Sequence, residues 1–307
     1  MNALIIGGSG GLSSVLAVKA QEKYNVYTLT RGERKLPSGV ISLKADRNDI
    51  NAVRELLAAT NIHFDVIFDC ICMNEEHANL DLEVLSKYTN RLIVISTDSV
   101  YDGRFKKTPE DEEGVCLDTE SDVRGYAEDK RRMEKVFLKE MTQIAAPMKI
   151  TIFRPGHIFG PGFLLGCYPE HSRQIDLVDH IRSMKPVRLV GMGIYLIHPI
   201  YVDDLADTMI DCVDNDKTFG EIFCIGGPEA IENRYYYECI AKALGVGITF
   251  EEVPVRGYLE NHPEYSGHLC HRIYNLTKLR NTGVKMPGTH IYDGISRTLK
   301  WMNKCDL

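Results

Sequence analysis

The segment Ala3–Ser14, with the sequence ALIIGGSGGLSS, decides the fold of this chain. Its first four residues form an apolar run typical of a buried strand, and a helical pattern begins after the glycines, at Leu12. Gly7 allows a tight turn off the strand, and Gly10 lets the backbone approach a pyrophosphate with no Cβ in the way. Backbone amides at the start of the helix would point at that anion. The segment therefore predicts the strand, phosphate loop and helix of a dinucleotide-binding fold, with a plain glycine-rich turn as the alternative.

The rest of residues 1–155 alternates short apolar runs with helical patterns. The predicted strands are Ala3–Ile6, Val26–Leu29, Val40–Leu43, Val66–Phe68, Leu92–Ile95 and Ile150–Phe153, and the predicted helices are Leu12–Ala20, Ile50–Ala58, Glu76–Tyr88 and Tyr126–Met141. Each strand is too apolar to be half exposed, which favours a parallel sheet covered on both faces. Alternating strands and helices predict a Rossmann-type, doubly wound α/β domain.

Residues 156–307 are less regular. Helices are predicted at Asp203–Val213, Asn233–Leu244 and Tyr292–Met302, with long stretches between them that have no period. We expect a smaller C-terminal lobe that is partly interleaved with the first domain, so that some of its segments return to the sheet.

The composition limits the class of protein. The chain has 307 residues, of which 44% are hydrophobic and 26% charged, so it can bury a sizeable core and is not disordered. No apolar run reaches the roughly 18 residues of a membrane span, and the first residues lack the basic start of a signal peptide. A net charge of -7 disfavours binding to nucleic acid, and nine scattered cysteines indicate reduced thiols. We therefore expect a cytoplasmic enzyme.

The second predicted strand ends without the acidic residue that usually holds the ribose hydroxyls of adenosine. Thr30 stands there, and Arg31 follows it. A carboxylate would repel a 2′-phosphate, whereas an arginine beside a hydroxyl can bind one through charge-assisted hydrogen bonds. The sequence therefore favours NADP(H) as the cofactor. If Arg31 is instead a solvated surface charge, NAD(H) is the alternative.

A tyrosine and a lysine four residues apart indicate proton transfer. Tyr126 and Lys130 project from one face of a predicted helix, and an ammonium held near a phenol lowers the pKa of that phenol. The strand Leu92–Ile95 ends in a hydroxyl cluster, and Thr97 would point into the same crevice, because ligands of such sheets lie at the carboxyl ends of the strands. Taken alone, the tyrosine and lysine could equally be an exposed helix pair.

The glycine loop, the strand-end hydroxyl and the Tyr-x-x-x-Lys pair, in this order, resemble the NAD(P)-dependent epimerase/dehydratase family, the extended short-chain dehydrogenases. Phe153–Gly162 (FRPGHIFGPG) is similar to the family's loop after its sixth strand, and His198–Ala206 (HPIYVDDLA) to a later strand-to-helix segment. The resemblance covers nearly the whole chain. Ser13 replaces the third glycine of the loop and is small enough for close packing.

The resemblance implies a set of functional residues. Tyr126 would be the general acid/base, Lys130 would lower its pKa and bind the nicotinamide ribose, and Thr97 would hydrogen-bond the reacting oxygen. The residues expected to contact the dinucleotide are Gly7, Ser9, Gly10, Gly11, Leu12, Thr30, Arg31, Asp46, Cys70 and Lys130. Asp46 stands where the family places an acid near the adenine amine, and a cap for the helix from Ile50 is the alternative.

The resemblance also implies a substrate class. Family members mostly act on sugars, often nucleotide-activated ones, and the C-terminal lobe selects the substrate. Dehydratases usually follow the threonine with Asp-Glu, whereas here Asp98 is followed by Ser99. The missing glutamate argues against dehydration and leaves an epimerase or a reductase, the latter favoured by the likeness of Val100–Gly103 to keto-sugar reductases. The family habit suggests a homodimer.

Three further sets of residues allow either a structural or a functional interpretation. The run Phe68–Cys72 (FDCIC) stands where the family carries small residues beside the cofactor, and we interpret the two cysteines in that way, not as metal ligands. Asp69 would tune the cofactor or cap the helix from Asn74. His157 and His198 are expected to be structural hydrogen-bonding residues, with a ligand or acid/base role as the alternative.

A second hypothesis comes from another functional class. The strand end at Thr30–Gly32 and the segment Phe64–Asp69 resemble an atypical branch of the family that includes plastid proteins binding RNA stem-loops. An RNA binder should carry a basic stripe, whereas this chain is net acidic and retains Thr97, Tyr126 and Lys130. We therefore expect a small-molecule substrate, and neither a nucleic acid nor a membrane as partner.

Overall fold

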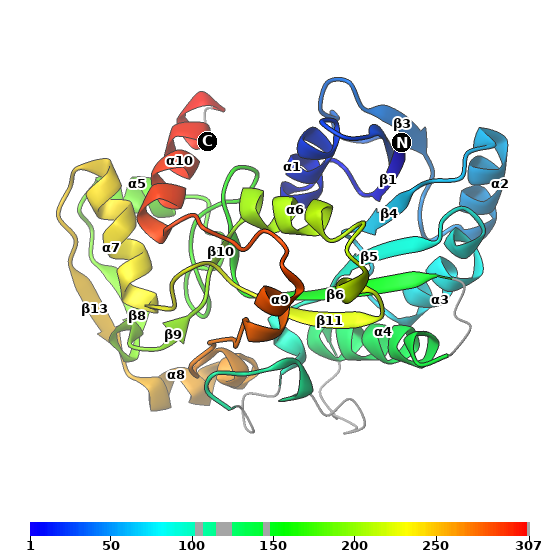
Figure 1. The fold of residues 1–307 in the computed structure, drawn as a ribbon. Coiled ribbons are helices and arrows are strands. Elements are labelled where there is room, and N and C mark those ends of the chain that lie inside the picture. Colours follow the sequence, from blue (N-terminus) through cyan, green and yellow to red (C-terminus); the bar gives the residue numbers. More distant parts are fainter. Residues whose placement is uncertain (102–106, 115–124, 144–147, 306–307) are drawn as a thin grey trace.

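A computed structural model of the chain describes residues 1–101, 107–114, 125–143 and 148–305. Its centre is a seven-stranded sheet in which every neighbouring pair of strands is parallel (Figure 1). From one edge to the other the strands are β11 (Glu221–Ile225), β6 (Lys149–Pro155), β5 (Arg91–Ile95), β4 (Val66–Asp69), β1 (Asn2–Ile6), β2 (Asn25–Thr30) and β3 (Ile41–Lys44). Because the order runs outward from β1 in both directions, the predicted Rossmann-type fold is confirmed.

Helices cover both faces of the sheet (Figure 1). On one face α1 (Gly11–Ala20) packs beside α6 (Val202–Asp211), and their apolar side chains join those of β1 and β6 in one core. On the other face lie α2 (Ile50–Thr60), α3 (Glu75–Glu83) and α4 (Tyr126–Met141). The buried strands β1, β4, β5 and β6 therefore need apolar residues on both sides, as their sequences predict.

Two predictions for the first half need correction. The third strand is not buried: Ile41 and Ser42 of β3 are exposed, because this strand forms the edge of the sheet. The predicted helix Glu76–Tyr88 is interrupted, since α3 ends at Glu83 and a separate 3₁₀ turn follows at Leu85–Lys87.

A second group of elements, which we call the C-terminal lobe, packs around its own core beside the sheet (Figure 1). Its helices are α5 (Leu177–Arg182), α7 (Asn233–Leu244), α8 (Val255–Asn261) and α10 (Ile291–Lys304). Its short strands pair as β7 (Ile158–Phe159) with β10 (Ile200–Tyr201), β9 (Leu196–Ile197) with β12 (Ile231–Glu232), and β8 (Val187–Val190) with β13 (Phe250–Val253). The chain returns to the sheet through α6, β11 and α9 (Thr277–Thr282).

Two general expectations can be compared with the described residues. Within them, no helix is long and apolar enough to cross a membrane. Their cysteines, from Cys70 to Cys305, are all free thiols; Cys116 lies outside the described part of the chain.

Candidate active site

The glycine loop forms a turn that only small residues fit. Gly7 and Gly8 have φ of 111° and 126°, and the amide of Gly7 donates to the carbonyl oxygen of Leu29 at 3.0 Å. The hydroxyl of Ser13 accepts a hydrogen bond from the amide of Gly10 at 3.1 Å, so the serine that replaces the third glycine closes the loop. A Cβ on Gly10 would meet nothing within 4 Å except that hydroxyl at 3.4 Å. No side chain therefore stands between the backbone of Gly10 and an anion at the start of α1, which is where a dinucleotide pyrophosphate is expected.

The C-terminal lobe covers the start of the same helix. A Cβ on Gly11 would lie 2.5 Å from the ring of Phe163, and one on Gly162 would lie 2.8 Å from the Cα of Gly11. The guanidinium of Arg173 sits 4.7 Å from the centre of the Phe163 ring. Sequence reasoning missed Phe163 and Arg173, and only the glycines at 160 and 162 signal such a close approach.

The strand end proposed to bind the adenosine ribose carries polar groups with local partners. The hydroxyl of Thr30 accepts a hydrogen bond from the amide of Gly32 at 3.1 Å. The side chain of Arg31 is 61% exposed and pairs with Glu33 at 2.9 Å. The structure therefore leaves the role of Arg31 in cofactor selection as a prediction.

Asp46 lies in the loop between β3 and α2. Its carboxylate accepts hydrogen bonds from the backbone amide and the side chain of Asn48, both at 2.9 Å, and the first of these is the main cause that lowers its pKa. Asp49 caps α2, because its carboxylate accepts from the amides of Asn51 and Ala52. The alternative in which Asp46 caps this helix is therefore wrong.

The end of β4 contains a buried ionic network. The carboxylate of Asp69 accepts from the amide of Ile71 at 2.8 Å and pairs with Arg47 at 2.6 Å, and the same guanidinium pairs with Asp81 at 2.9 Å. Asn74 caps α3, so Asp69 does not. Oxygen and sulfur atoms of Asp69, Cys72 and Asp81 lie within 4.8 Å of one another, but the guanidinium of Arg47 already pairs with both carboxylates. Next in the chain, Cys70 has a pKa raised by burial.

Thr97 and Tyr126 meet where β5 ends and α4 begins. Thr97 lies close enough to the hydroxyl of Tyr126 to act on its pKa, and Tyr126 is 49% exposed. Lys130 is buried one turn further along, where its ammonium donates to the carbonyl oxygens of Cys72 (2.5 Å) and Ile95 (2.8 Å) and lies 6.0 Å from the centre of the Tyr126 ring.

The electrostatics of this pair differ from those expected. Burial of the hydroxyl raises the pKa of Tyr126, while the side chain of Thr97 acts in the opposite direction. Burial lowers the pKa of Lys130. The pKa of Tyr126 is therefore not lowered overall, and the ammonium of Lys130 is turned toward two backbone carbonyls. The catalytic roles of the three residues stay predictions.

Asp98 is buried directly after Thr97 and is held by the C-terminal lobe. Its carboxylate forms an ion pair with Arg272 and accepts a hydrogen bond from the hydroxyl of Tyr274. The amide of Tyr274 donates to Nδ1 of His198, whose Nε2 therefore donates to the carbonyl oxygen of Gly227 at 2.9 Å. His198 is thus a structural residue, as expected. Asp102 and Gly103, from the segment compared with keto-sugar reductases, lie outside the described residues.

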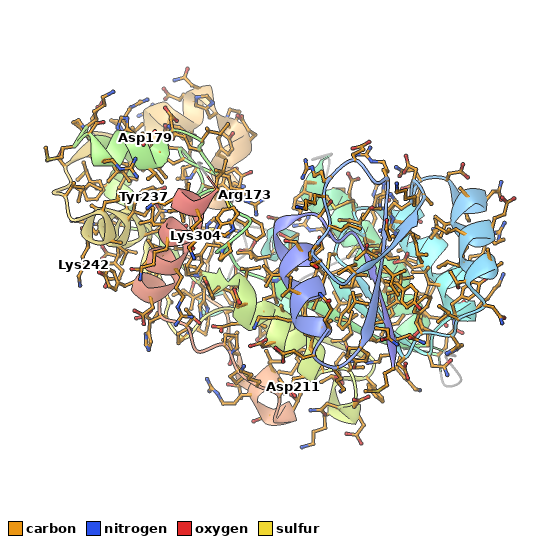
Figure 2. The ribbon with its side chains drawn as sticks, turned by 90° about the horizontal axis from the view of Figure 1, so that it is seen from above. Arg173, Asp179, Asp211, Tyr237, Lys242 and Lys304 are labelled. Atoms are coloured by element: carbon orange, nitrogen blue, oxygen red, sulfur yellow. The ribbon has the colours of Figure 1, made fainter. Side chains whose placement is uncertain are left out.

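His157, between β6 and β7, has one buried ring nitrogen that no described residue uses. Its Nε2 is buried and has no hydrogen-bond partner among the described residues, and burial lowers the pKa of the imidazole to about 3. Arg173 and Asp98 are the charged groups that act on both His157 and Tyr126. Figure 2 shows Arg173 on the side of the C-terminal lobe that faces the sheet. A neutral histidine, two hydroxyls and an arginine therefore converge beside the glycine loop.

Solved structures with the same fold include enzymes that act on nucleotide sugars. UDP-glucose 4-epimerase from Thermotoga maritima aligns with 100% of both chains at 18% identity and a TM-score of 0.80. dTDP-glucose 4,6-dehydratase from Bacillus anthracis, determined in complex with NAD, aligns over 99% of this chain and 97% of its own at 20% identity and a TM-score of 0.75. At these identities the likeness shows the fold alone.

Sequence comparisons identify a curated relative and a family. The chloroplast stem-loop binding protein of 41 kDa b from Arabidopsis thaliana is 26% identical over 271 residues, which are 83% of this chain and 65% of that protein. The model of the family described as "NAD dependent epimerase/dehydratase family" matches residues 3–226. Because this match covers more than half of the sequence, the chain belongs to the NAD dependent epimerase/dehydratase family.

Proposed function

We propose that this protein is an NAD(P)-dependent epimerase or reductase of a sugar or nucleotide sugar. The observation that carries the proposal is the placement of Thr97 beside the hydroxyl of Tyr126 at the carboxyl end of the sheet, the end at which the glycine loop joins β1 to α1. The nucleotide-sugar enzymes that share the fold support this substrate class.

The chain's own residues suit a bound dinucleotide. Gly7, Gly10 and the first turn of α1 would hold the pyrophosphate, Asp46 the adenine, and Lys130 the ribose next to the nicotinamide. When bound, the nicotinamide supplies or accepts hydride. We propose NADP(H) as the preferred form because Thr30 and Arg31 replace a carboxylate, and NAD(H) as the alternative, which the NAD-bound relatives favour.

Tyr126 would move the proton that accompanies hydride transfer. Tyr126 as a whole is 49% exposed, and Thr97 lies beside its hydroxyl. His157, held neutral by burial, would offer its unpaired Nε2 to a substrate oxygen as donor or acceptor. The substrate would lie between these residues and Arg173 in the C-terminal lobe.

The substitution Tyr126→Phe tests the proposal. We expect at least a 100-fold loss of kcat with nucleotide sugars, because the proton donor is removed while the ring keeps its packing. The Kd for the dinucleotide should stay within about twofold of wild type. Tyr235→Phe is the matched control, since Tyr235 is similarly exposed (42%) but lies in the C-terminal lobe on α7. Retention of most of the kcat by Tyr126→Phe would exclude Tyr126 from the mechanism.

The absorbance of the purified protein separates the two reaction types. An epimerase returns the hydride to its own substrate and retains its cofactor, whereas a reductase releases it after each turnover. Retained dinucleotide would favour the epimerase. The proposed homodimer can be tested on the same sample by analytical ultracentrifugation.

RNA binding is the second candidate function, because the curated relative is a stem-loop binding protein. That relative extends beyond the aligned region, since the alignment covers 65% of its length. A binder that uses phosphate contacts should lose affinity for a stem-loop RNA steeply between about 50 and 200 mM salt. We expect no such binding from a chain with a net charge of -7. Salt-dependent binding together with no effect of Tyr126→Phe would favour the RNA-binding function.

A further inference from the structure

Two loops at the carboxyl ends of different strands are tied together by side chains. The first, residues 45–49 between β3 and α2, carries Asp46, which we expect to contact adenine. The second, residues 70–74 between β4 and α3, carries Cys70 and passes the glycine turn, where a Cβ on Gly7 would lie 3.7 Å from Ile71. A dinucleotide lying along the sheet edge would contact both loops.

His77, in the first turn of α3, connects these loops through its two ring nitrogens. Nδ1 accepts a hydrogen bond from the amide of Met73 at 3.1 Å, so the neutral ring carries its proton on Nε2 and donates to the side-chain oxygen of Asn48 at 2.9 Å. Asn48 in turn donates to Asp46 at 2.9 Å. Burial and the nearby Arg47 lower the pKa of His77, which keeps the ring in the neutral form that this pattern requires.

Arg47 makes a second, deeper connection between the same loops. It comes from the first loop, and its guanidinium pairs with Asp69, the last residue of β4 before the second loop, and with Asp81 on α3. The carboxylate of Asp69 accepts a hydrogen bond from the amide of Ile71. One residue later, the carbonyl oxygen of Cys72 accepts a hydrogen bond from the ammonium of Lys130. The network therefore continues from the loop of Asp46 to the lysine expected at the nicotinamide ribose.

We propose that His77 and Arg47 are positioning residues that fix the distance between the adenine side and the nicotinamide side of the cofactor site. Neither would touch the cofactor. Both act by holding the two loops together through side chains. This inference rests on the proposed function, because it assumes that a dinucleotide occupies the site.

The substitution His77→Leu tests this inference with little risk to folding, since the ring lies at the partly exposed edge of the network. The Kd for NAD⁺ or NADP⁺, whichever wild type binds more tightly, should rise about fivefold to tenfold, because two hydrogen bonds that pre-organise the site are lost. The Kd for AMP, measured by NMR titration, should change less than about twofold, because AMP occupies only one loop. His77→Gln keeps a donor and an acceptor and should restore dinucleotide binding to within about twofold of wild type.

His63→Leu is the matched control, because His63 is exposed on the chain just before β4 and should leave both dissociation constants unchanged. Equal weakening of AMP and dinucleotide by His77→Leu, or no weakening of either, would overturn the inference while leaving the proposed function intact. Failure of wild type to bind either dinucleotide would instead contradict the proposed function itself. Failure of His77→Gln to restore binding would also count against the positioning role.

Discussion

Asp69 and Asp98 stand at or just past the ends of neighbouring strands, β4 and β5, and each is buried against an arginine, but the two arginines come from different parts of the molecule. Asp69 pairs with Arg47, only 22 residues earlier and within the same α/β unit. Asp98 pairs with Arg272 and also binds Tyr274, which lies 176 residues later, in the segment between α8 and α9.

This difference shows that ion pairs at the same edge of a sheet can have two roles, one within the sheet domain and one between the two parts of the molecule. The pair at Asp69 stabilises loops within the sheet domain and leaves the C-terminal lobe untouched. The pair at Asp98 joins the segment Arg272–Tyr274 to the residue next to Thr97, so it ties the C-terminal lobe to the hydroxyls that we propose take part in the reaction. Loss of the first pair should therefore affect folding most, and loss of the second should affect turnover most.

The largest effect is expected from Arg47→Met. Removal of the guanidinium leaves Asp69 and Asp81 buried without a cation, which should lower the free energy of unfolding by about 3–5 kcal/mol. Urea denaturation measures this loss. Arg54→Met is the control, because Arg54 forms an exposed pair with Glu83 and its loss should cost less than about 1 kcal/mol. A loss below that control would show that the network at Asp69 carries no stability.

Arg272→Met should have a smaller effect on stability, about 2 kcal/mol, since the hydroxyl of Tyr274 still donates to Asp98. Turnover should fall by at least tenfold, because the lobe that carries Arg173 and His157 would lose its fixed position over Tyr126. The ratio of activity loss to stability loss is the decisive measurement. If it is no larger than for Arg47→Met, the distinction between the two aspartates fails.

Acid should lower the free energy of unfolding of the protein through protonation of His157. Its pKa is about 3 in the folded protein against 6.5 for an ordinary histidine, so the folded state resists protonation. The stability due to the neutral ring is complete above pH 6.5 and is lost as the pH falls from 6.5 toward 3, with a limiting slope of about 1.4 kcal/mol per pH unit. His157→Gln should flatten this part of the stability curve from thermal melts in buffers of different pH. An unchanged slope would mean that the ring gains water or a partner in solution.

The smallest effect is expected from Arg31, whose side chain is exposed and pairs with a single carboxylate. Because it is 61% exposed and pairs with Glu33, we expect NADP⁺ to bind about threefold to tenfold more tightly than NAD⁺. Arg31→Ala should remove most of the preference, as calorimetric titration of both dinucleotides would show. Equal affinities in wild type, or a preference for NAD⁺, would refute the assignment.

Local patterns predicted the sheet domain well and its long-range partners not at all. The glycines after β1 mark the end of that strand, and the apolar periods of α4 and, in the C-terminal lobe, of α7 mark both helices to the residue, because turn chemistry and helix period depend on adjacent positions. Two-residue strands such as β9 and β10 are too short to show a period, which is why most of the C-terminal lobe was not predicted.

The site divides in the same way. The contact between Thr97 and Tyr126 follows from a strand end and a helix start that the sequence already indicates. The partners Arg47 and Arg272 carry no such signal. Each arginine meets its carboxylate only after the chain has folded, and no fixed spacing in the sequence marks the pair. The pKa of Tyr126 could not be predicted either, since its direction depends on how deeply the hydroxyl is buried and on where Lys130 points.

The contact between Gly11 and Phe163 has a consequence for how the chain can vary. At position 11 the sheet domain has no side chain. At position 163 the C-terminal lobe supplies an aromatic ring that fills the volume a side chain at position 11 would occupy. The two side chains therefore compete for the same volume. A larger side chain at position 11 requires a smaller one at position 163. Sequences that carry a large residue at the first position should carry a small one at the second, so that the seam between the lobes stays closed over the phosphate loop.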